Sequence, residues 1–278
     1  MKSISFLSKA LKALTITGLC LLFTFNASAQ TTAAVPSGYL TMAYIKVAPN
    51  KIAEYLKMEK AYKKLHAAGK KAGMRGDWTL YEVITPWGES GEYNFIAHDR
   101  YETAEQYAGS VEGTRLPNWE SLLTAEEMSL VKRTDEIRTL VKTEVWSLTE
   151  SIMPDGWDKK GKIAVFNYIA NGAGKTRADH VKIEKDIWMP VHSQRIKDGK
   201  MTAWWLMTLE APFGSSMPYN SVAVDLYPDM KSYLANWFDE YFKKVHPTKN
   251  VDDLMKQTRE NSNLFKGEVR MVVDRLSW

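Results

Sequence analysis

The sequence predicts an α+β protein made of two tandem copies of one unit, each with the order strand, helix, strand, strand, helix, strand. Two observations carry this prediction. Ten positions hold the same residue in 78–101 and in 204–227, always at an offset of 126. Strand-like and helix-like spacings of apolar residues also follow one another in the same order in both copies, which is the pattern of a repeated unit.

Two further matches lie outside that stretch. Residues 134–145 match 258–269 at an offset of 124, and residues 57–60 match 182–185 at an offset of 125. Small length changes between the copies would produce such a drift. We therefore expect equivalent side chains of the two copies to have equivalent surroundings.

The elements of the first copy follow from local patterns. Good helix formers at helical spacing predict a helix from Ile52 that Gly69 and Gly73 close. Thr124 and Glu127 form a capping box, which predicts a further helix to about residue 140. Runs of β-branched and aromatic residues predict strands over 39–47, 78–84, 93–101 and 141–149.

The second copy repeats this order. Pro190 lies inside its first predicted helix, where the missing backbone N–H predicts a kink or a break. The predicted strands are 163–169, 204–209, 220–226 and 268–276, and the predicted helices are 177–197, 232–245 and 251–265.

The first 29 residues have the pattern of a secretory signal peptide. Three lysines precede an apolar run of about 13 residues, short of the roughly 20 that span a bilayer. Ala27, Ser28 and Ala29 form a small-residue cleavage site, so we expect a secreted or periplasmic protein with no membrane anchor after cleavage. Cys20 is the only cysteine and leaves with the signal, which excludes thiol catalysis and cysteine-bound metals in the mature chain.

Charge excludes one class of partner. Three of the 37 Lys and Arg residues fall in the signal, which leaves 34 basic residues against 33 acidic ones. We expect no nucleic-acid partner, because that function needs a basic surface. The predicted segments are 1–29 signal peptide, 30–37 flexible leader, 38–150 first repeat, 151–161 linker and 162–278 second repeat.

A unit with this order of strands and helices is the ferredoxin-like split βαβ. Two such units in tandem, with second strands that begin at Trp78 and Trp204, resemble the dimeric α+β barrel superfamily. The resemblance implies that the two antiparallel sheets pair into one barrel within a single chain. The superfamily includes cofactor-independent monooxygenases, haem enzymes such as the chlorite dismutases and stress-responsive proteins, so the fold alone does not fix the function.

The first predicted helix of each copy carries a glutamate on a face with aromatic and histidine side chains. A buried carboxylate is costly, so this glutamate is an acid/base or ligand-binding candidate with a pKa raised by burial. An exposed glutamate, or one paired with a lysine, is the alternative. The members of the two faces are Tyr55, Glu59, Tyr62 and His66 in the first copy, and His180, Glu184, Trp188 and Val191 in the second.

His66 and His192 align near the end of that helix. The helix dipole favours a histidine there, so packing is the first interpretation, and a proton shuttle or an axial haem ligand is the second. We predict no cofactor, with haem kept as an alternative. We predict no metal site, because His180 and Glu184 are only two ligands on one helix and a catalytic zinc site needs three.

The third strand of each copy alternates between two faces. We expect Val222 and Val224 to pack on the helices, and Asp99 and Asp225 to face the barrel interior or the other copy and to bond a turn. Aromatic side chains are predicted to line a ligand pocket, with ordinary core as the alternative. We expect this pocket in the second copy, which is richer in aromatic residues; the pocket candidates are Tyr62, Trp78, His180, Trp188, Trp204 and Trp205.

Three functions stay open. The first is binding of a small aromatic or apolar molecule, which fits the absence of a recognisable catalytic motif. The second is a cofactor-independent monooxygenase or isomerase that uses Glu59 or Glu184 with His66 or His192. The third is haem binding through one histidine. The sequence leaves a homo-oligomer open.

Overall fold

The computed structural model describes residues 38–276 apart from 87–90, 215 and 236–237. These described residues belong to one compact unit. The predicted signal peptide and leader lie outside the described residues. Within the described part of the chain, no helix is long and apolar enough to cross a bilayer.

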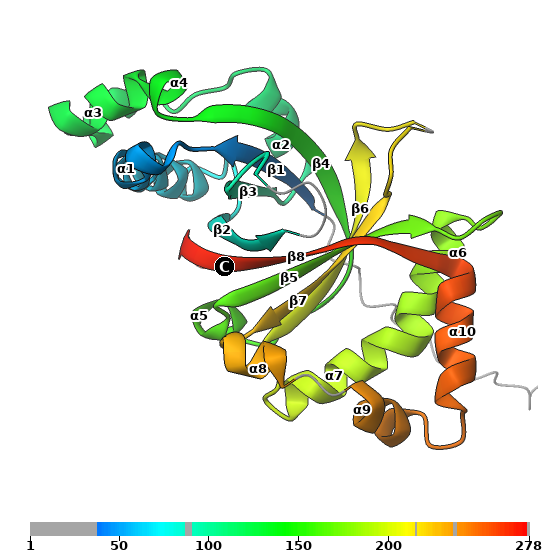
Figure 1. The fold of residues 1–278 in the computed structure, drawn as a ribbon. Coiled ribbons are helices and arrows are strands. Elements are labelled where there is room, and N and C mark those ends of the chain that lie inside the picture. The colour runs from blue at the N-terminus through cyan, green and yellow to red at the C-terminus, as the bar shows by residue number, and fades with distance from the viewer. Residues whose placement is uncertain (1–37, 87–90, 215, 236–237, 277–278) are drawn as a thin grey trace, which may run out of the picture. The chain divides into compact units, whose positions relative to one another are not determined.

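Eight antiparallel strands close into a barrel in the order β1-β3-β2-β8-β5-β7-β6-β4 (Figure 1). The predicted α+β barrel is therefore confirmed. The strands of the first half are β1 (Tyr39–Lys46), β2 (Trp78–Pro86), β3 (Phe95–Tyr101) and β4 (Thr139–Ile152). Those of the second half are β5 (Ile163–Asn171), β6 (Ala203–Ala211), β7 (Ser221–Tyr227) and β8 (Ser262–Arg275).

The two halves have the same strand order. The first half runs β4-β1-β3-β2 and the second runs β8-β5-β7-β6, which is the ferredoxin-like arrangement in each case. Pairing of β2 with β8 and of β4 with β6 joins the halves and closes the barrel. Closure leaves no unpaired sheet edge among these strands.

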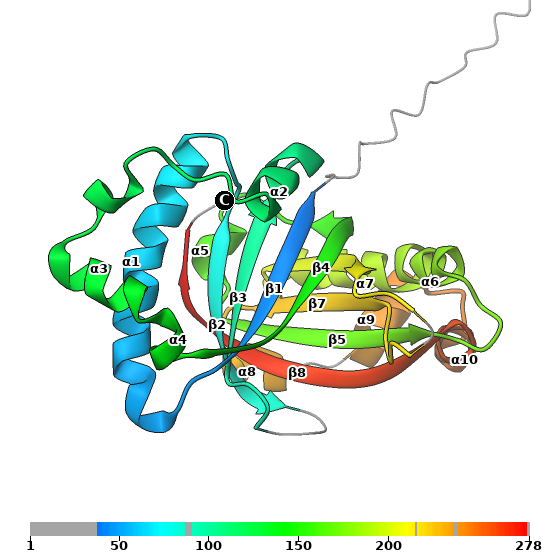
Figure 2. The same ribbon diagram turned by 90° about the horizontal axis from the view of Figure 1, so that it is seen from above.

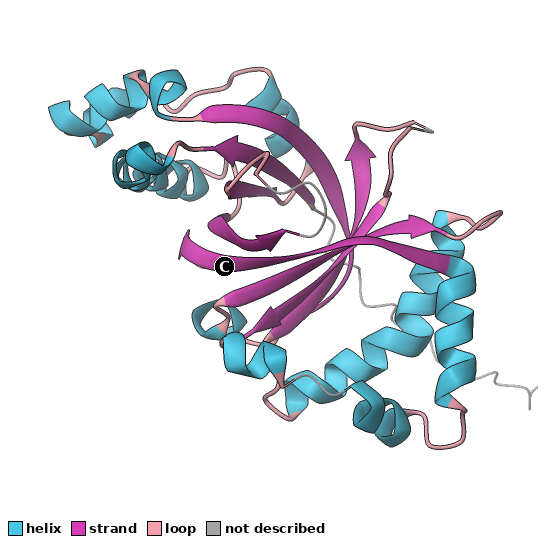
Figure 3. Cartoon of the chain, in the orientation of Figure 1, coloured by secondary structure: helices cyan, strands magenta, loops and turns pink. Residues whose placement is uncertain are grey.

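The helices lie on the outer side of the barrel (Figures 1 and 3). Seen from above, α1 runs along the outside of the first half, and α6, α7 and α10 lie against the second (Figure 2). The first half has α1 (Ile52–Lys71), α2 (Ala104–Val111), α3 (Ala125–Lys132) and α4 (Thr134–Ile137). The remaining helices are α5 (Trp157–Lys160), α6 (Arg177–Ile183), α7 (Met189–Lys197), α8 (Met230–Leu234), α9 (Phe238–Val245) and α10 (Val251–Asn261).

One π-helical turn, Glu184–Trp188, joins α6 to α7. The offset between matching residues is 125 at Glu59 and Glu184 but 126 at His66 and His192. A π-helical turn contains one more residue than an α-helical turn, so it absorbs the extra residue without turning the later side chains away from the sheet. Pro190 lies in the first turn of α7, directly after this π turn.

Two predicted helix ends are wrong. The helix predicted over 251–265 ends at Asn261, because Ser262 already pairs with Asn171 as the first residue of β8. The helix that the Thr124 capping box opens is real, but it is interrupted at Arg133 and stops at Ile137. Pairing of Ser262 with Asn171, and of Thr139 with Lys46, therefore overrides local helix propensity at the two positions.

The predicted faces of the third strands are also wrong. Val222 and Val224 pack inside the barrel against β1 and β5 side chains. Asp99 and Asp225 point to the helices, beside His66 and His192. Period-two alternation identifies which residues share a face but not which face is the interior. The barrel interior here is mainly apolar and aromatic, so the valine side chains face it.

Candidate functional site

A histidine, an arginine, an aspartate and a tyrosine meet under α1 in the first half. His66 lies on α1, Asp99 and Tyr101 lie on β3, and Arg75 lies in the connection between α1 and β2. The Arg75 guanidinium contacts both His66 Nδ1 and the Asp99 carboxylate, and its Nη2 lies 3.4 Å from the Tyr101 hydroxyl. The His66 ring stacks on Trp78, with 5.4 Å between ring centroids and 17° between planes.

His66 is held neutral at physiological pH. Burial lowers the pKa of His66 to about 4; the Asp99 carboxylate opposes this shift, while the nearby Arg75 charge adds to it. A neutral imidazole can donate at one nitrogen and accept at the other. Its surroundings therefore prepare His66 for hydrogen bonding rather than for charge pairing.

A cavity of about 630 Å³ opens beside this cluster, between α1, α2 and the segment that leads to α3. His66, Tyr101 and Arg75 form part of its wall. The rest combines apolar side chains with polar and charged ones, and small-molecule sites likewise join an apolar lining to polar groups that orient the ligand. The apolar part is Leu65, Met74, Leu116, Trp119 and Val131, and the polar part includes Tyr62, Gln106, Ser110, Thr114 and Arg115.

The second half contains the same cluster. His192 on α7 stacks on Trp204, with 5.4 Å between centroids and 15° between planes. Arg195 Nη1 lies 3.5 Å from His192 Nδ1, and its Nη2 lies 3.2 Å from the Tyr227 hydroxyl. Asp225 lies 3.8 Å from His192 Nδ1. Trp78 and Trp204 therefore have equivalent surroundings.

Side chains fill the space beside the second cluster. Trp188 stacks on the other face of His192 at 5.9 Å, and Phe238 and Phe242 meet Trp188 edge-on. His192 is only 4% exposed. The aromatic side chains that predicted a pocket in the second half thus pack on one another there, and the large cavity described above belongs to the first half.

The two predicted glutamates are buried in different ways. Glu59 accepts a 2.7 Å bond from Arg138, yet burial still raises the pKa of Glu59 above its ordinary value. Glu184 lies 3.9 Å from His180, and burial together with the Asp225 charge raises the pKa of Glu184 to about 8. Glu184 is therefore a neutral carboxylic acid at pH 7, whereas Arg138 balances Glu59.

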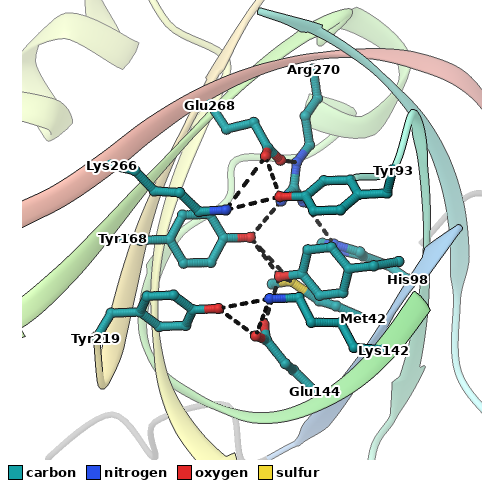
Figure 4. A network of polar contacts seen from close by, with 11 residues as sticks. Met42, Tyr93, His98, Lys142, Glu144, Tyr168, Tyr219, Lys266, Glu268 and Arg270 are labelled. Atoms are coloured by element: carbon teal, nitrogen blue, oxygen red, sulfur yellow. Dashed lines mark hydrogen bonds and ion pairs between the residues drawn. The ribbon is translucent and has the colours of Figure 1, made fainter. Parts of the chain in front are cut away.

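A second polar cluster lies inside the barrel, across the seams between the halves (Figure 4). Tyr44 donates to Glu144 at 2.6 Å, and its hydroxyl lies 2.7 Å from that of Tyr168. Tyr219 donates to Glu144 at 2.5 Å. Tyr93 makes the matching bond to Glu268 at 2.6 Å, so Tyr93 and Tyr219 each bond a carboxylate of the other half.

Arg270 breaks the symmetry of this cluster. It is fully buried, donates to Glu268 and to the Tyr168 hydroxyl at 2.5 Å each, and lies 3.6 Å above the Phe166 ring. Burial alone would raise the pKa of Glu268, but the Arg270 and Lys266 charges hold it below its ordinary value. The position of Arg270 in the other half is Trp146, which stacks on Tyr219. This cluster is closely paired internally, which favours a role in closing the barrel.

The structure brings some predicted site residues together and separates others. Tyr62 and His66 line the cavity, and Trp78 lies directly behind His66. Trp205 points into the barrel, where it meets Trp157. Across the described residues, no three His, Cys, Asp or Glu side chains form a group that could hold a metal ion.

Arg75, Tyr101 and Trp119 were not identified from the sequence. Tyr101 is part of the repeat and shares its strand face with Asp99, so a correct assignment of that face would have found it. Arg75 follows the helix and has no arginine at the matching position of the second copy, which is Met201. Trp119 lies in a connecting segment whose position only the folded chain defines.

Comparison with known proteins gives structural matches alone. No family model and no curated protein matches the sequence. Among solved structures, 73 chains match. An anthrone oxidase-like protein is 11% identical, with 87% of this chain and 93% of that chain covered and a TM-score of 0.47. A haem-binding protein from Thermus thermophilus is 7% identical, with 86% and 92% covered and a TM-score of 0.46.

A chlorite dismutase from Candidatus Nitrospira defluvii is 9% identical, with 84% of this chain and 90% of that chain covered and a TM-score of 0.42. All three similarities are weak in sequence and in superposition. We therefore take the fold from the strand pairing of this chain, and the function from its own side chains.

Proposed function

We propose that this chain is an exported protein that binds a small, largely apolar molecule in the cavity beside α1. The cavity itself carries the proposal. At about 630 Å³ it lies within the range of small-molecule sites, and its apolar wall converges on a few fixed polar groups. The stacking of His66 on Trp78 and the contacts of Arg75 hold those groups in place before a ligand arrives.

The second half supports this assignment by contrast. We infer a tandem duplication from the recurring offsets and from the shared strand order. Both halves have the His, Arg, Asp and Tyr cluster, but in the second half aromatic side chains occupy the adjoining space. The first half then binds the ligand, and the second supplies the other side of the barrel.

The experiment fills the cavity from one residue of its wall. Gly109 on α2 lines the cavity, so Gly109→Leu places a side chain there. We expect the parent to bind about one molecule of 1-anilinonaphthalene-8-sulfonate per chain. The affinity should be about tenfold lower in G109L, because the leucine side chain occupies space that a part of the probe of similar size would otherwise fill. Ala235→Leu, at the matching exposed position of the second half, is the control and should bind like the parent. Equal binding by G109L and A235L would place the probe elsewhere.

A cofactor-independent monooxygenase or isomerase is the second candidate. The neutral imidazole of His66 in the cavity wall favours it, because such a group can take and return a proton. In that case a bound compound would be converted, and His66→Ala would remove conversion while the compound still binds. If the compounds of a panel bind in the cavity and none is converted, only the binding function remains supported.

Export rests on the N-terminal pattern of three lysines, a short apolar run and the Ala27-Ser28-Ala29 site. We propose that the mature chain begins at Gln30. Intact-mass measurement of the protein recovered from a secreting host should give the mass of residues 30–278. A retained N-terminus would contradict this part of the proposal and leave the cavity unaffected.

A further inference from the structure

The contact between Arg75 and His66 assigns the position of the imidazole proton. A guanidinium group has only hydrogen-bond donors, so His66 Nδ1 must accept from Arg75 Nη1. In a neutral ring the single proton then sits on Nε2. No other described residue bonds Nε2, and His66 is part of the cavity wall. His66, a residue of the cavity wall, thus carries an N–H donor at Nε2 that no described residue uses.

We propose that His66 Nε2–H is the polar anchor of this cavity, and that the ligand meets it with an acceptor oxygen, such as a carboxylate or carbonyl oxygen, rather than with a metal ion. This inference rests on the proposed binding function and specifies its chemistry. The ligand class is then an apolar body that ends in an acceptor oxygen.

The ring that carries this donor is fixed on both sides. Trp78 stacks on His66 at 5.4 Å, and Tyr62 lies tilted at 6.3 Å. The Asp99 carboxylate neutralises the Arg75 charge that points at Nδ1. A donor held in this way loses little conformational entropy when it bonds a ligand, which is how a preorganised site gains affinity.

The two halves reach the same arginine–histidine contact from different positions in the chain. Arg195 lies three residues after His192 on α7, and Gly69 lies three residues after His66 on α1. A Cβ at Gly69 would lie 3.1 Å from Arg75 Cδ, so the absence of a side chain there makes room for Arg75. An arginine at Nδ1 therefore recurs although its chain position differs, which supports a specific role for the contact.

Haem does not fit these histidines. A histidine that ligates iron presents the lone pair of one nitrogen and donates a proton from the other to an acceptor. Arg75 and Arg195 instead place a donor at Nδ1 of His66 and of His192. The other three histidines of the chain are buried. The Nε2 atom of His98 contacts Arg270, and that of His246 contacts the Ile187 carbonyl. The third, His180, is fully enclosed.

The first experiment reads the proton directly in the ligand-free full chain. With ¹⁵N-labelled histidine, and His66→Gln to assign the signal, His66 should show a protonated Nε2 and an unprotonated Nδ1. Arg75→Met should shift this pattern towards a mixture of tautomers, because the guanidinium donor is removed. A proton on Nδ1 in the parent would overturn the inference whatever the cavity binds.

The second experiment compares two probes of the same ring system, 1-naphthoate and naphthalene. His66→Phe keeps an aromatic ring on Trp78 but removes the donor, and His66→Gln keeps an amide N–H near the position of Nε2. We expect H66F to bind 1-naphthoate about tenfold more weakly than the parent, as loss of one charge-assisted hydrogen bond predicts, with naphthalene affinity unchanged. H66Q should recover most of the naphthoate affinity.

Each outcome decides between the two proposals. If both probes bind the parent and H66F weakens neither, or both equally, His66 is not the anchor, while the cavity remains a binding site. If neither probe binds the parent, the proposed function and this ligand class both fail, and the tautomer measurement alone stands. A Soret shift on haemin addition that H66F abolishes would overturn the exclusion of haem.

Discussion

The hydroxyl groups of Tyr44 and Tyr168 lie 2.7 Å apart inside the barrel, and each residue is on the first strand of its half. Tyr44 also bonds Glu144, and Tyr168 accepts from Arg270. This pair therefore connects the buried carboxylate of Glu144 in the first half, through Arg270, to the buried carboxylate of Glu268 in the second. Because partly satisfied buried networks are costly, we expect the pair to contribute to barrel closure as a unit.

The first prediction concerns that pair. Tyr44→Phe and Tyr168→Phe should each lower the free energy of unfolding by about 1–3 kcal/mol, because a buried partner is left unsatisfied. The double variant should lose less than the sum, by at least about 0.5 kcal/mol, since the two residues share one bond. Urea denaturation measures all three. Tyr107→Phe, on the half-buried outer helix α2, is the control, and full additivity would show that the hydroxyls act independently.

The second prediction concerns Arg270. Arg270→Met leaves the Glu268 carboxylate buried without its closest cation, so we expect a loss of about 3–5 kcal/mol in the free energy of unfolding. Lys142→Met is the matched control, because the Lys142 side chain is 34% exposed and water can replace it beside Glu144. That variant should lose less than about 1 kcal/mol. Similar losses for both would contradict the assignment of Arg270 as the buried centre.

The third prediction uses the raised pKa of Glu184, about 8 in the folded protein against an ordinary value of 4.5. Between pH 6.5 and 8 the folded chain holds a proton on Glu184 that the unfolded chain has lost. The free energy of unfolding should therefore fall as pH rises through this window, by up to about 1.4 kcal/mol per pH unit. Asp225 has a pKa of about 6, so it also makes the free energy of unfolding fall as pH rises, but only at lower pH.

The histidines define the lower edge of this window. His66 and His180 have pKa values of about 4, below the ordinary value of 6.5, so below pH 6.5 they make stability rise with pH. Urea titrations at pH 6.5, 7.25 and 8 should show the fall in the parent and in Asp186→Asn, an exposed residue of the same π turn. Glu184→Gln should remove the fall. A flat profile in the parent would contradict a buried neutral Glu184.

Local patterns in the sequence were sufficient for the order of the elements. Alternation located β1 within one residue of its ends, and the Thr124 capping box forms as predicted. Both signals depend on residues that are neighbours in the chain. The step at Ser262 from α10 into β8 depends instead on pairing with Asn171, 91 residues earlier in the chain, and no local pattern contains it.

The candidate site was predictable only in part. Tyr62 and His66 lie on the wall of the cavity because helical spacing places them on one face of α1. The space of the cavity depends on residues that have no side chain, such as Gly69 and Gly109, and on the path of the segment that carries Trp119. Sequence patterns report where large side chains lie, but not whether neighbouring side chains fill the space between them, as Phe238 does beside Trp188.

The last prediction exchanges the two routes to the arginine. Gly69→Arg with Arg75→Met gives the first half the residues of the second, Arg195 and Met201. Alone, G69R should be destabilising despite better helix propensity, since its Cβ meets Arg75, and R75M should be destabilising because Asp99 loses its cation. Together they should recover at least about 1 kcal/mol relative to the sum, because one guanidinium again lies between His66 and Asp99. Urea denaturation of the four proteins measures this coupling, and strict additivity would show that positions 69 and 195 are not equivalent.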